Sequence, residues 1–146
     1  KELALTNGAN GATASISTVK STAKESAPVT ESQTIDVQTS AGETKTGTYQ
    51  VPKDNVFGVT DIVVANFQGD EGLLTITFGD RKITTIALET FRNQDYHWVT
   101  PIKIPENDTV TVEVTCEKPG TPATGRRAQG CHEVLNVSGV LSRTTQ

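Results

Sequence analysis

The sequence predicts an all-β protein, an antiparallel two-sheet sandwich of the jelly-roll type. From Thr34 onward, apolar and polar residues alternate in short runs, which is typical of strands with one buried face. Residues that favour turns separate these runs, and no long helical pattern lies between them. About eight strands with this spacing indicate a sandwich or a barrel. An immunoglobulin-like sandwich is the alternative, because the turn pattern alone does not distinguish the two folds.

The clearest strand covers residues 109–116, where valines and a cysteine alternate with polar residues. The row that we expect to be buried there is Val110, Val112, Val114 and Cys116. In residues 73–78 the corresponding row is Leu74, Ile76 and Phe78. The other expected strands cover residues 34–39, 44–51, 56–67, 82–90, 96–104 and 131–141.

Glycines mark two special points in this pattern. Gly79-Asp80 stands between Phe78 and the next alternating run, as the turn of a short hairpin does. In the last strand, Gly139 interrupts the buried row and predicts a close approach of two backbones or a bulge. The buried row of that strand is Leu135, Val137 and Leu141.

Residues 1–33 differ from the remainder, which we assign as the sandwich domain, residues 34–146. Ser, Thr, Ala, Asn and Gly dominate this N-terminal stretch, and large apolar residues are sparse. Such a segment buries too little surface to offset its ordering entropy, so we expect a linker or an arm that packs on a neighbour. Because the sequence does not begin with Met, we expect that a signal peptide or membrane anchor has been removed.

The two cysteines, Cys116 and Cys131, flank a polar loop rich in Gly and Pro. Neither belongs to a Cys-x-x-Cys unit, so a structural disulfide is a better interpretation than a redox motif or a zinc site. Closing a loop of about 15 residues stabilises a fold by roughly 3 kcal/mol in the chain-entropy model. A disulfide also indicates an oxidising compartment, so we expect a secreted or cell-surface protein. Two buried thiols in a cytosolic protein are the alternative.

The charge and hydropathy of the chain argue against a nucleic-acid partner and against a membrane-spanning segment. The net charge is -4 and the pI is near 5.1, and the 13 basic residues are scattered, so we expect no nucleic-acid partner. No run of about 18 apolar residues occurs, so we expect no membrane-spanning segment.

The most suggestive stretch for binding is Asp95-Tyr96-His97-Trp98. Asp95 and His97 project to the same side of a strand, so Asp95 is expected to orient the imidazole. Together with His132 and Glu133, they suggest a metal site, but the paired-histidine spacing of such sites is absent. A solvated histidine at a strand edge is the favoured interpretation.

The aromatic residues Phe91, Tyr96 and Trp98 suggest a platform for binding sugars. Their place in the alternation favours the core instead, because aromatic residues make up only 5% of the chain and the core needs them. The expected core row is Tyr96, Trp98, Thr100, Ile102 and Ile104.

No group of residues in the sequence forms a convincing catalytic site. No serine lies in a Gly-x-Ser-x-Gly turn, and a disulfide leaves no cysteine nucleophile. Acidic residues such as Asp70, Glu71 and those at 106–108 lie in expected turns, where they are most often solvated.

These observations favour a non-enzymatic interaction or structural module that acts outside the cell. It would bind another protein or itself, and no cofactor or catalytic residue is expected. The order of a strand, a Gly-Asp turn, an aromatic cluster and a final Cys-containing strand resembles many extracellular jelly rolls, without assigning a function to any residue. The alternative is a carbohydrate-binding or metal-binding module centred on Asp95, Tyr96, His97 and Trp98.

Overall fold

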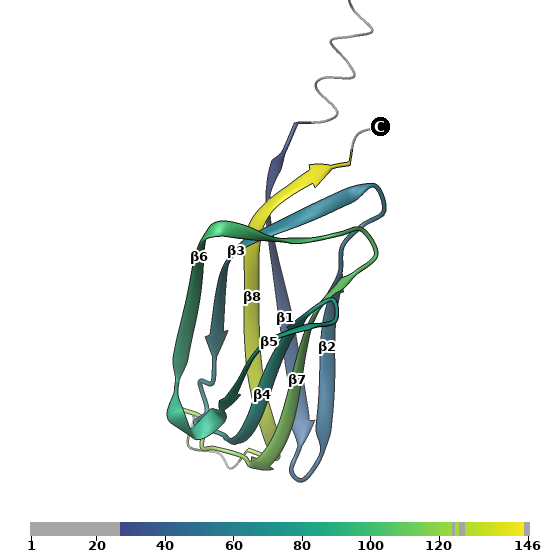
Figure 1. Ribbon diagram of the computed structural model, residues 1–146. Helices are drawn as coiled ribbons and strands as arrows, with labels where there is room; N and C mark the ends of the chain where they lie inside the picture. The colour runs from purple at the N-terminus through teal and green to yellow at the C-terminus, as the bar shows by residue number, and fades with distance from the viewer. Residues whose placement is uncertain (1–26, 124, 126–127, 145–146) are drawn as a thin grey trace, which may run out of the picture.

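The computed structural model describes residues 27–123, 125 and 128–144, which form two antiparallel sheets packed face to face (Figure 1). The expected antiparallel sandwich is confirmed. The strands are β1 (Val29–Ser40), β2 (Thr44–Gln50), β3 (Asn55–Ala65), β4 (Glu71–Phe78), β5 (Arg81–Ala87), β6 (Asn93–Ile104), β7 (Thr109–Lys118) and β8 (Gly130–Arg143).

The order of the strands is that of a jelly roll. The first sheet, which we call sheet A, has the order β1-β8-β3-β6, and the second, sheet B, has the order β2-β7-β4-β5. The first strand therefore pairs with the last, the second with the seventh, the third with the sixth and the fourth with the fifth. A long hairpin that wraps around itself gives this pairing, so the structure selects the jelly roll over the immunoglobulin-like alternative.

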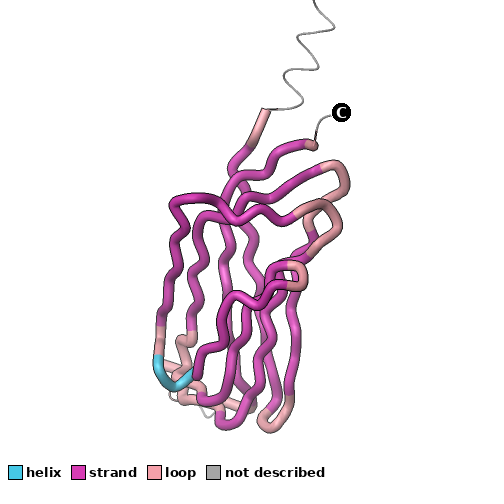
Figure 2. Tube along the Cα trace, in the orientation of Figure 1, coloured by secondary structure: helices cyan, strands magenta, loops and turns pink. Residues whose placement is uncertain are grey.

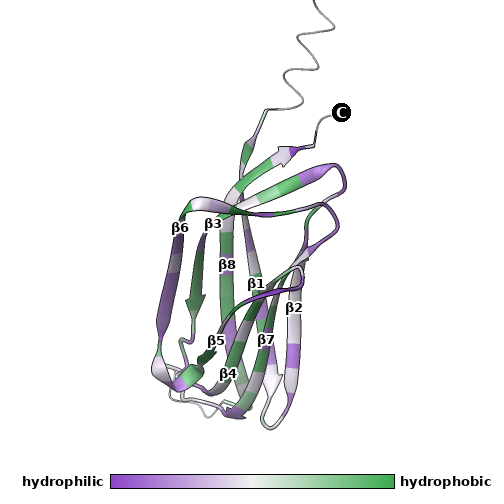
Figure 3. Ribbon diagram, viewed as in Figure 1, coloured by the Kyte–Doolittle hydropathy of each residue, from purple (hydrophilic) through white to green (hydrophobic). Residues whose placement is uncertain are grey.

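The core lies between the two sheets and follows from the alternation in the sequence. In β7, for example, Val110, Val112 and Val114 are at most 1% exposed, as the period of two predicts. Figure 3 shows hydrophobic residues along β3 and β8 and hydrophilic residues along much of β6 at the edge of sheet A. Burying each large apolar side chain stabilises the fold by about 1.5–3 kcal/mol, so this shared core holds the sheets together.

Both glycine predictions match the observed backbone. A Cβ atom on Gly139 would collide with the carbonyl oxygen of Gly58, and the β3 bulge between Val59 and Asp61 lies opposite Gly139. Gly79 has a φ of +62°, and the residues on either side of the two-residue turn, Phe78 and Arg81, pair with each other. A positive φ at the first turn residue suits a tight hairpin that follows the sheet twist.

Two boundaries differ from those expected. Residues 88–90, expected as the end of a strand, form a 3-10 turn at which the chain leaves sheet B for sheet A (Figure 2). Leu88 is fully buried there, and Thr90 donates a hydrogen bond of 2.6 Å to the carbonyl of Ala87. β1 begins at Val29, which pairs with Leu141, so the sheet extends into the stretch assigned to the linker. The remainder of that assignment, residues 1–26, lies outside the described residues.

The described part of the chain contains no helix that is long and apolar enough to cross a membrane.

Candidate functional site

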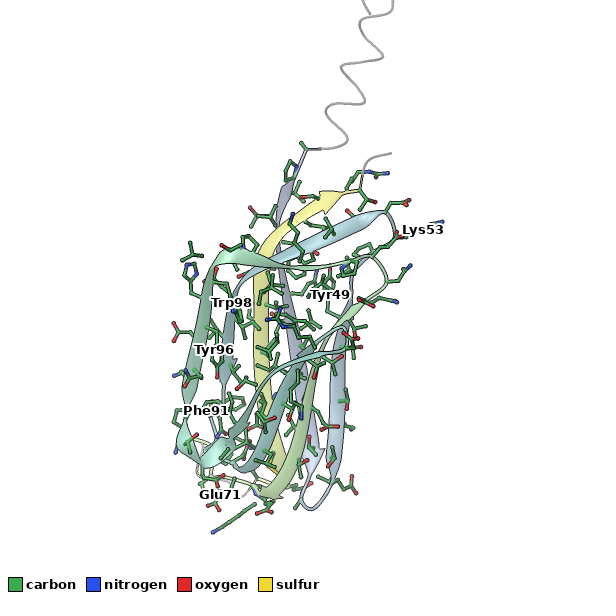
Figure 4. The ribbon with its side chains drawn as sticks, viewed as in Figure 1. Tyr49, Lys53, Glu71, Phe91, Tyr96 and Trp98 are labelled. Carbon is green, nitrogen blue, oxygen red and sulfur yellow. A yellow bond between two sulfur atoms is a disulfide. The ribbon has the colours of Figure 1, made fainter. Side chains whose placement is uncertain are left out.

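The expected site on β6 divides between the two faces of the strand. Tyr96 and Trp98 point toward the core and are half-buried against it (Figure 4). Their rings stack with centroids 6.2 Å apart, and Trp98 contacts Phe78 edge-on at 6.0 Å. This packing favours the core role over a sugar platform, because part of the surface of each ring is already covered by the core.

The expected core row is incomplete at one position. Ile102 and Ile104 pack in or against the core, but Thr100 is exposed. The pairing of β6 with β3 jumps from His97 to Ile102, opposite the bulge in β3, so the alternation is lost between these residues.

His97 has a partner other than the one expected. Its Nδ1 lies 2.9 Å from Oδ1 of Asp61 on β3, whereas Asp95 was expected to orient the ring. The hydrogen bond from Thr60 and then the one from His97 lower the pKa of the exposed Asp61 carboxyl. The two residues face each other because Asp61 and His97 are paired across β3 and β6.

His132 lies on the same outer face of sheet A but belongs to a second, separate pair. Its Nε2 lies 2.9 Å and 3.0 Å from the carboxylate oxygens of Asp36, and its ring contacts the ring of Phe67 at 4.8 Å. Asp61 pairs with Ser138, six residues along β8 from His132, so the structure keeps the two histidines far apart. Among the described residues, each imidazole meets one carboxylate, so the two histidines do not converge on a common site.

A buried pair of carboxyl groups lies inside the sandwich, at the end that carries the β1–β2 turn. Asp70, directly before β4, is fully buried, and Glu133 on β8 is 1% exposed. Sequence reasoning placed Asp70 in a solvated turn, which is wrong. Its Oδ1 accepts hydrogen bonds from the Gly120 amide (2.6 Å) and the Gln68 side chain (3.0 Å), and its Oδ2 accepts one from the His132 amide (2.9 Å).

Glu133 has a different environment from that of Asp70. Neither of its carboxyl oxygens meets a hydrogen-bond donor among the described residues. Burial raises the pKa of Glu133 to about 9, and the neighbouring carboxyl group of Asp70 adds to that effect. Glu133 is therefore protonated at neutral pH.

The two cysteines lie beside this acid pair. Cys116 on β7 and Cys131 on β8 have their sulfur atoms 2.11 Å apart and their Cα atoms 5.7 Å apart, so the bond joins the two sheets. A cavity of about 290 Å³ opens next to them, and Thr39, Gln68 and Cys131 are among the residues that line it.

The sequence contains one signal for the buried carboxyl pair that the sequence-based prediction did not use. Glu133 has the same parity in β8 as Cys131, Leu135 and Val137, so the alternation itself places a carboxyl group in the core. Asp70 gives no such signal, because Gly-Asp-Glu-Gly is indistinguishable from a solvated turn.

Comparison with known proteins identifies no family. No protein-family model and no curated protein matches the chain. Among solved structures, it is similar to a chain of the virus-like particle of the giant freshwater prawn Macrobrachium rosenbergii extra small virus. The identity is 13%, the TM-score is 0.43, and the match covers 82% of this chain and 81% of that one.

Two further structures, of infectious bursal disease virus strains Gx and Gt, match 82% of the chain at 14% and 13% identity, with TM-scores of 0.31 and 0.27. The matched part is 37% of each of those longer chains. Likenesses at these levels assign no function.

Proposed function

We propose that this jelly roll is a non-enzymatic structural module that acts by associating with a protein, either a different one or further copies of itself. The buried polar residues support a structural role, because their hydrogen bonds join loops to strands. Asn66, for instance, donates hydrogen bonds from its side-chain amide to the carbonyls of Asp70, Leu88 and Phe91.

The observation that carries the proposal is a set of exposed apolar side chains on the outer face of sheet A. Val63, Phe67 and Val140 are 46%, 49% and 39% exposed there, although large apolar residues are costly to leave in water. Val63 lies on β3 opposite Asn136, Val140 lies on β8, and Phe67 contacts His132 at the end of β8. We call this surface the valine face. Grouped exposed apolar residues commonly mark surfaces that bind proteins.

The outer face of sheet B supplies a contrast. It is mainly threonine, the polar residue best suited to a solvated strand, and its one exposed large apolar residue among those described is Leu73. The threonines are Thr44, Thr46, Thr48, Thr75, Thr77, Thr85, Thr109, Thr111 and Thr115. The valine face is therefore the better candidate for association.

The place of action that we propose is outside the reducing cytoplasm, at the cell surface or in the extracellular space. The approach of Cys116 and Cys131 to bonding distance supports it, because disulfides persist in oxidising compartments. The net charge of -4 supports a protein rather than a nucleic acid as the partner.

Two matched variants test this proposal. Val63→Glu places a charge on the valine face, and Leu73→Glu places one on sheet B at a site with similar exposure. Wild type and Leu73→Glu should associate in concentration-dependent light scattering, or capture the same protein from native extract, and Val63→Glu should lose that association at least tenfold. Equal behaviour of the two variants would contradict the proposal, as would a wild type that stays monomeric and captures nothing.

A further inference from the structure

The chain contains two copies of the Asn-x-Ser/Thr motif, which accepts N-linked glycans in secreted proteins. They are Asn107-Asp108-Thr109 and Asn136-Val137-Ser138. The motif is short and occurs often by chance, so its place in the fold decides whether it can carry a glycan. A glycan is bulky and hydrated, and it therefore needs an asparagine whose side chain is exposed and not engaged in the fold. The structure separates the two motifs on this criterion.

Asn107 lies at the tip of the turn between β6 and β7. The amide of Asp108 donates a hydrogen bond of 3.2 Å to the carbonyl of Pro105, which closes the turn. Asn107 occupies the third position of that turn with a φ of +68° and is exposed. Asparagine adopts this left-handed conformation more readily than most residues, so the acceptor residue itself suits the turn.

The contacts of Asn107 hold its backbone and leave its side-chain amide unused. Its backbone N–H donates to the carbonyl of Val51 at 2.8 Å, and its carbonyl accepts from the side chain of Gln50 at 2.9 Å. Within the described part of the chain, all hydrogen bonds of Asn107 belong to its backbone. A sugar attached to its Nδ2 would therefore break no hydrogen bond of the fold.

Asn136 has the opposite environment. It lies in the middle of β8, paired with β1 on one side and β3 on the other, and it is only partly exposed. Its Nδ2 lies 3.0 Å from Oγ of Ser32, 3.2 Å from Oγ1 of Thr34 and 3.4 Å from the carbonyl oxygen of Gln33. N-glycosylation replaces one of the two hydrogens on Nδ2, so a glycan there would disrupt these contacts with β1.

We propose that Asn107 is an N-glycosylation site of this protein and that Asn136 stays unmodified. The donor is an oligosaccharide linked to a polyprenyl diphosphate. Nδ2 of Asn107 forms a bond to the anomeric carbon of the first sugar and loses one proton to solvent. The bond from that carbon to the diphosphate oxygen breaks, and the polyprenyl diphosphate leaves with the electron pair. The inference rests on the place of action proposed above, because this transfer takes place outside the cytoplasm.

The position of Asn107 is compatible with association through the valine face. Its turn is hydrogen-bonded to the segment between β2 and β3. Figure 4 shows Lys53 of that segment at the end of the sandwich away from Glu71. Asn107 therefore lies at one end of the sandwich, whereas Asn136 lies directly opposite Val63. A glycan on Asn136 would cover the valine face, and a glycan on Asn107 leaves Val63 open.

The test is peptide mapping of the full chain isolated from its native source. Free thiols are alkylated, the disulfide is reduced, and trypsin then places the two motifs on separate peptides, residues 104–126 and 128–143. An amidase that removes N-linked glycans converts the modified asparagine to aspartate and, in heavy-oxygen water, labels it. A sample without the amidase controls for spontaneous deamidation. Asn107 should carry the label, and Asn136 should not.

Two variants expressed in the same cells are the matched comparison. Asn107→Asp removes the acceptor amide and keeps a residue that tolerates the positive φ of the turn. This variant should lose the mass of the glycan and migrate as amidase-treated wild type does. Asn136→Asp should keep the glycan and migrate as untreated wild type does. Circular dichroism follows the fold of each protein.

An unlabelled Asn107 in the native protein would overturn the proposal, and so would a glycan on Asn136. The cysteines show which proposal has failed. If Asn107 is unlabelled while Cys116 and Cys131 are bonded, only the glycan inference is wrong. If both thiols are free as well, the proposed place of action is also wrong. Association is measured separately, so its failure would leave a labelled Asn107 as support for the glycan.

Discussion

At the scale of single residues, Glu133 has the least ordinary environment in the described part of the chain. It lies on the buried row of β8, its oxygens lack donors, and its neighbour is another carboxyl group. Keeping its proton avoids a negative charge on Glu133 in the core. Such a residue links the stability of the fold to pH.

The sign of this dependence follows from the raised pKa of Glu133. Between its ordinary value of 4.5 and about 9, the unfolded chain releases a proton that the folded chain retains. The stabilising contribution is therefore complete below about pH 4.5 and decreases as the pH rises toward 9, by up to about 1.4 kcal/mol per pH unit. Glu133→Gln keeps a neutral side chain at every pH, so this part of the dependence should vanish.

The measurement is urea unfolding of the oxidised protein between pH 5 and 9. Glu133→Gln should have the flatter profile, and it should be more stable than wild type at the alkaline end. Glu113→Gln serves as the control and should follow the wild-type profile. Parallel profiles for Glu133→Gln and wild type would show that Glu133 does not hold a proton in the fold.

A second prediction at this scale compares two neighbours on β6. Trp98 packs against Phe78, Tyr96 and the core, whereas the side chain of Val99 is 90% exposed. Because Trp98 is half-buried, its truncation to Ala should cost about 2 kcal/mol, below the range for a fully buried ring. Val99→Ala should stay within about 0.5 kcal/mol of wild type. Urea unfolding measures both, and a Trp98→Ala variant as stable as wild type would restore the ligand-platform interpretation.

At the scale of elements, the alternation in the sequence was sufficient to locate the strands. In β7 a period of two needs no information from other parts of the chain, because each valine is sorted by its own strand. The contacts of Asp70 and His97, in contrast, join residues that lie far apart in the sequence. The donors to Asp70 from Gly120 and His132 lie 50 and 62 residues away, and the partner of His97 lies 36 residues away on β3. Such contacts depend on strand order and register, which local patterns do not contain.

At the scale of the whole molecule, the Cys116–Cys131 bond joins strands of different sheets near one end of the sandwich. Alkylation of natively expressed protein under non-reducing conditions, followed by mass spectrometry, should find no free thiol. Cys116→Ser should cost about 2–5 kcal/mol in thermal or urea unfolding. Two alkylated cysteines in native protein would contradict both the bond and the compartment proposed from it.

The valine face is also a property of the whole molecule, because β3 and β8 meet there only after the hairpin has wrapped. Strand parity places Val63 on the outer face of sheet A and Leu73 on the outer face of sheet B. Which of the two faces carries the exposed valines follows from the strand orders β1-β8-β3-β6 and β2-β7-β4-β5. The difference between these faces is the basis of the proposed association.

Radical footprinting of the associated and isolated protein tests that association most directly, because it reports which side chains become covered. The account predicts that labelling of Phe67, Val63 and Val140 falls on association, while labelling of Leu73 on the opposite sheet stays constant. Protection of Leu73 without protection of the valine face would contradict the account, and so would unchanged labelling of both faces.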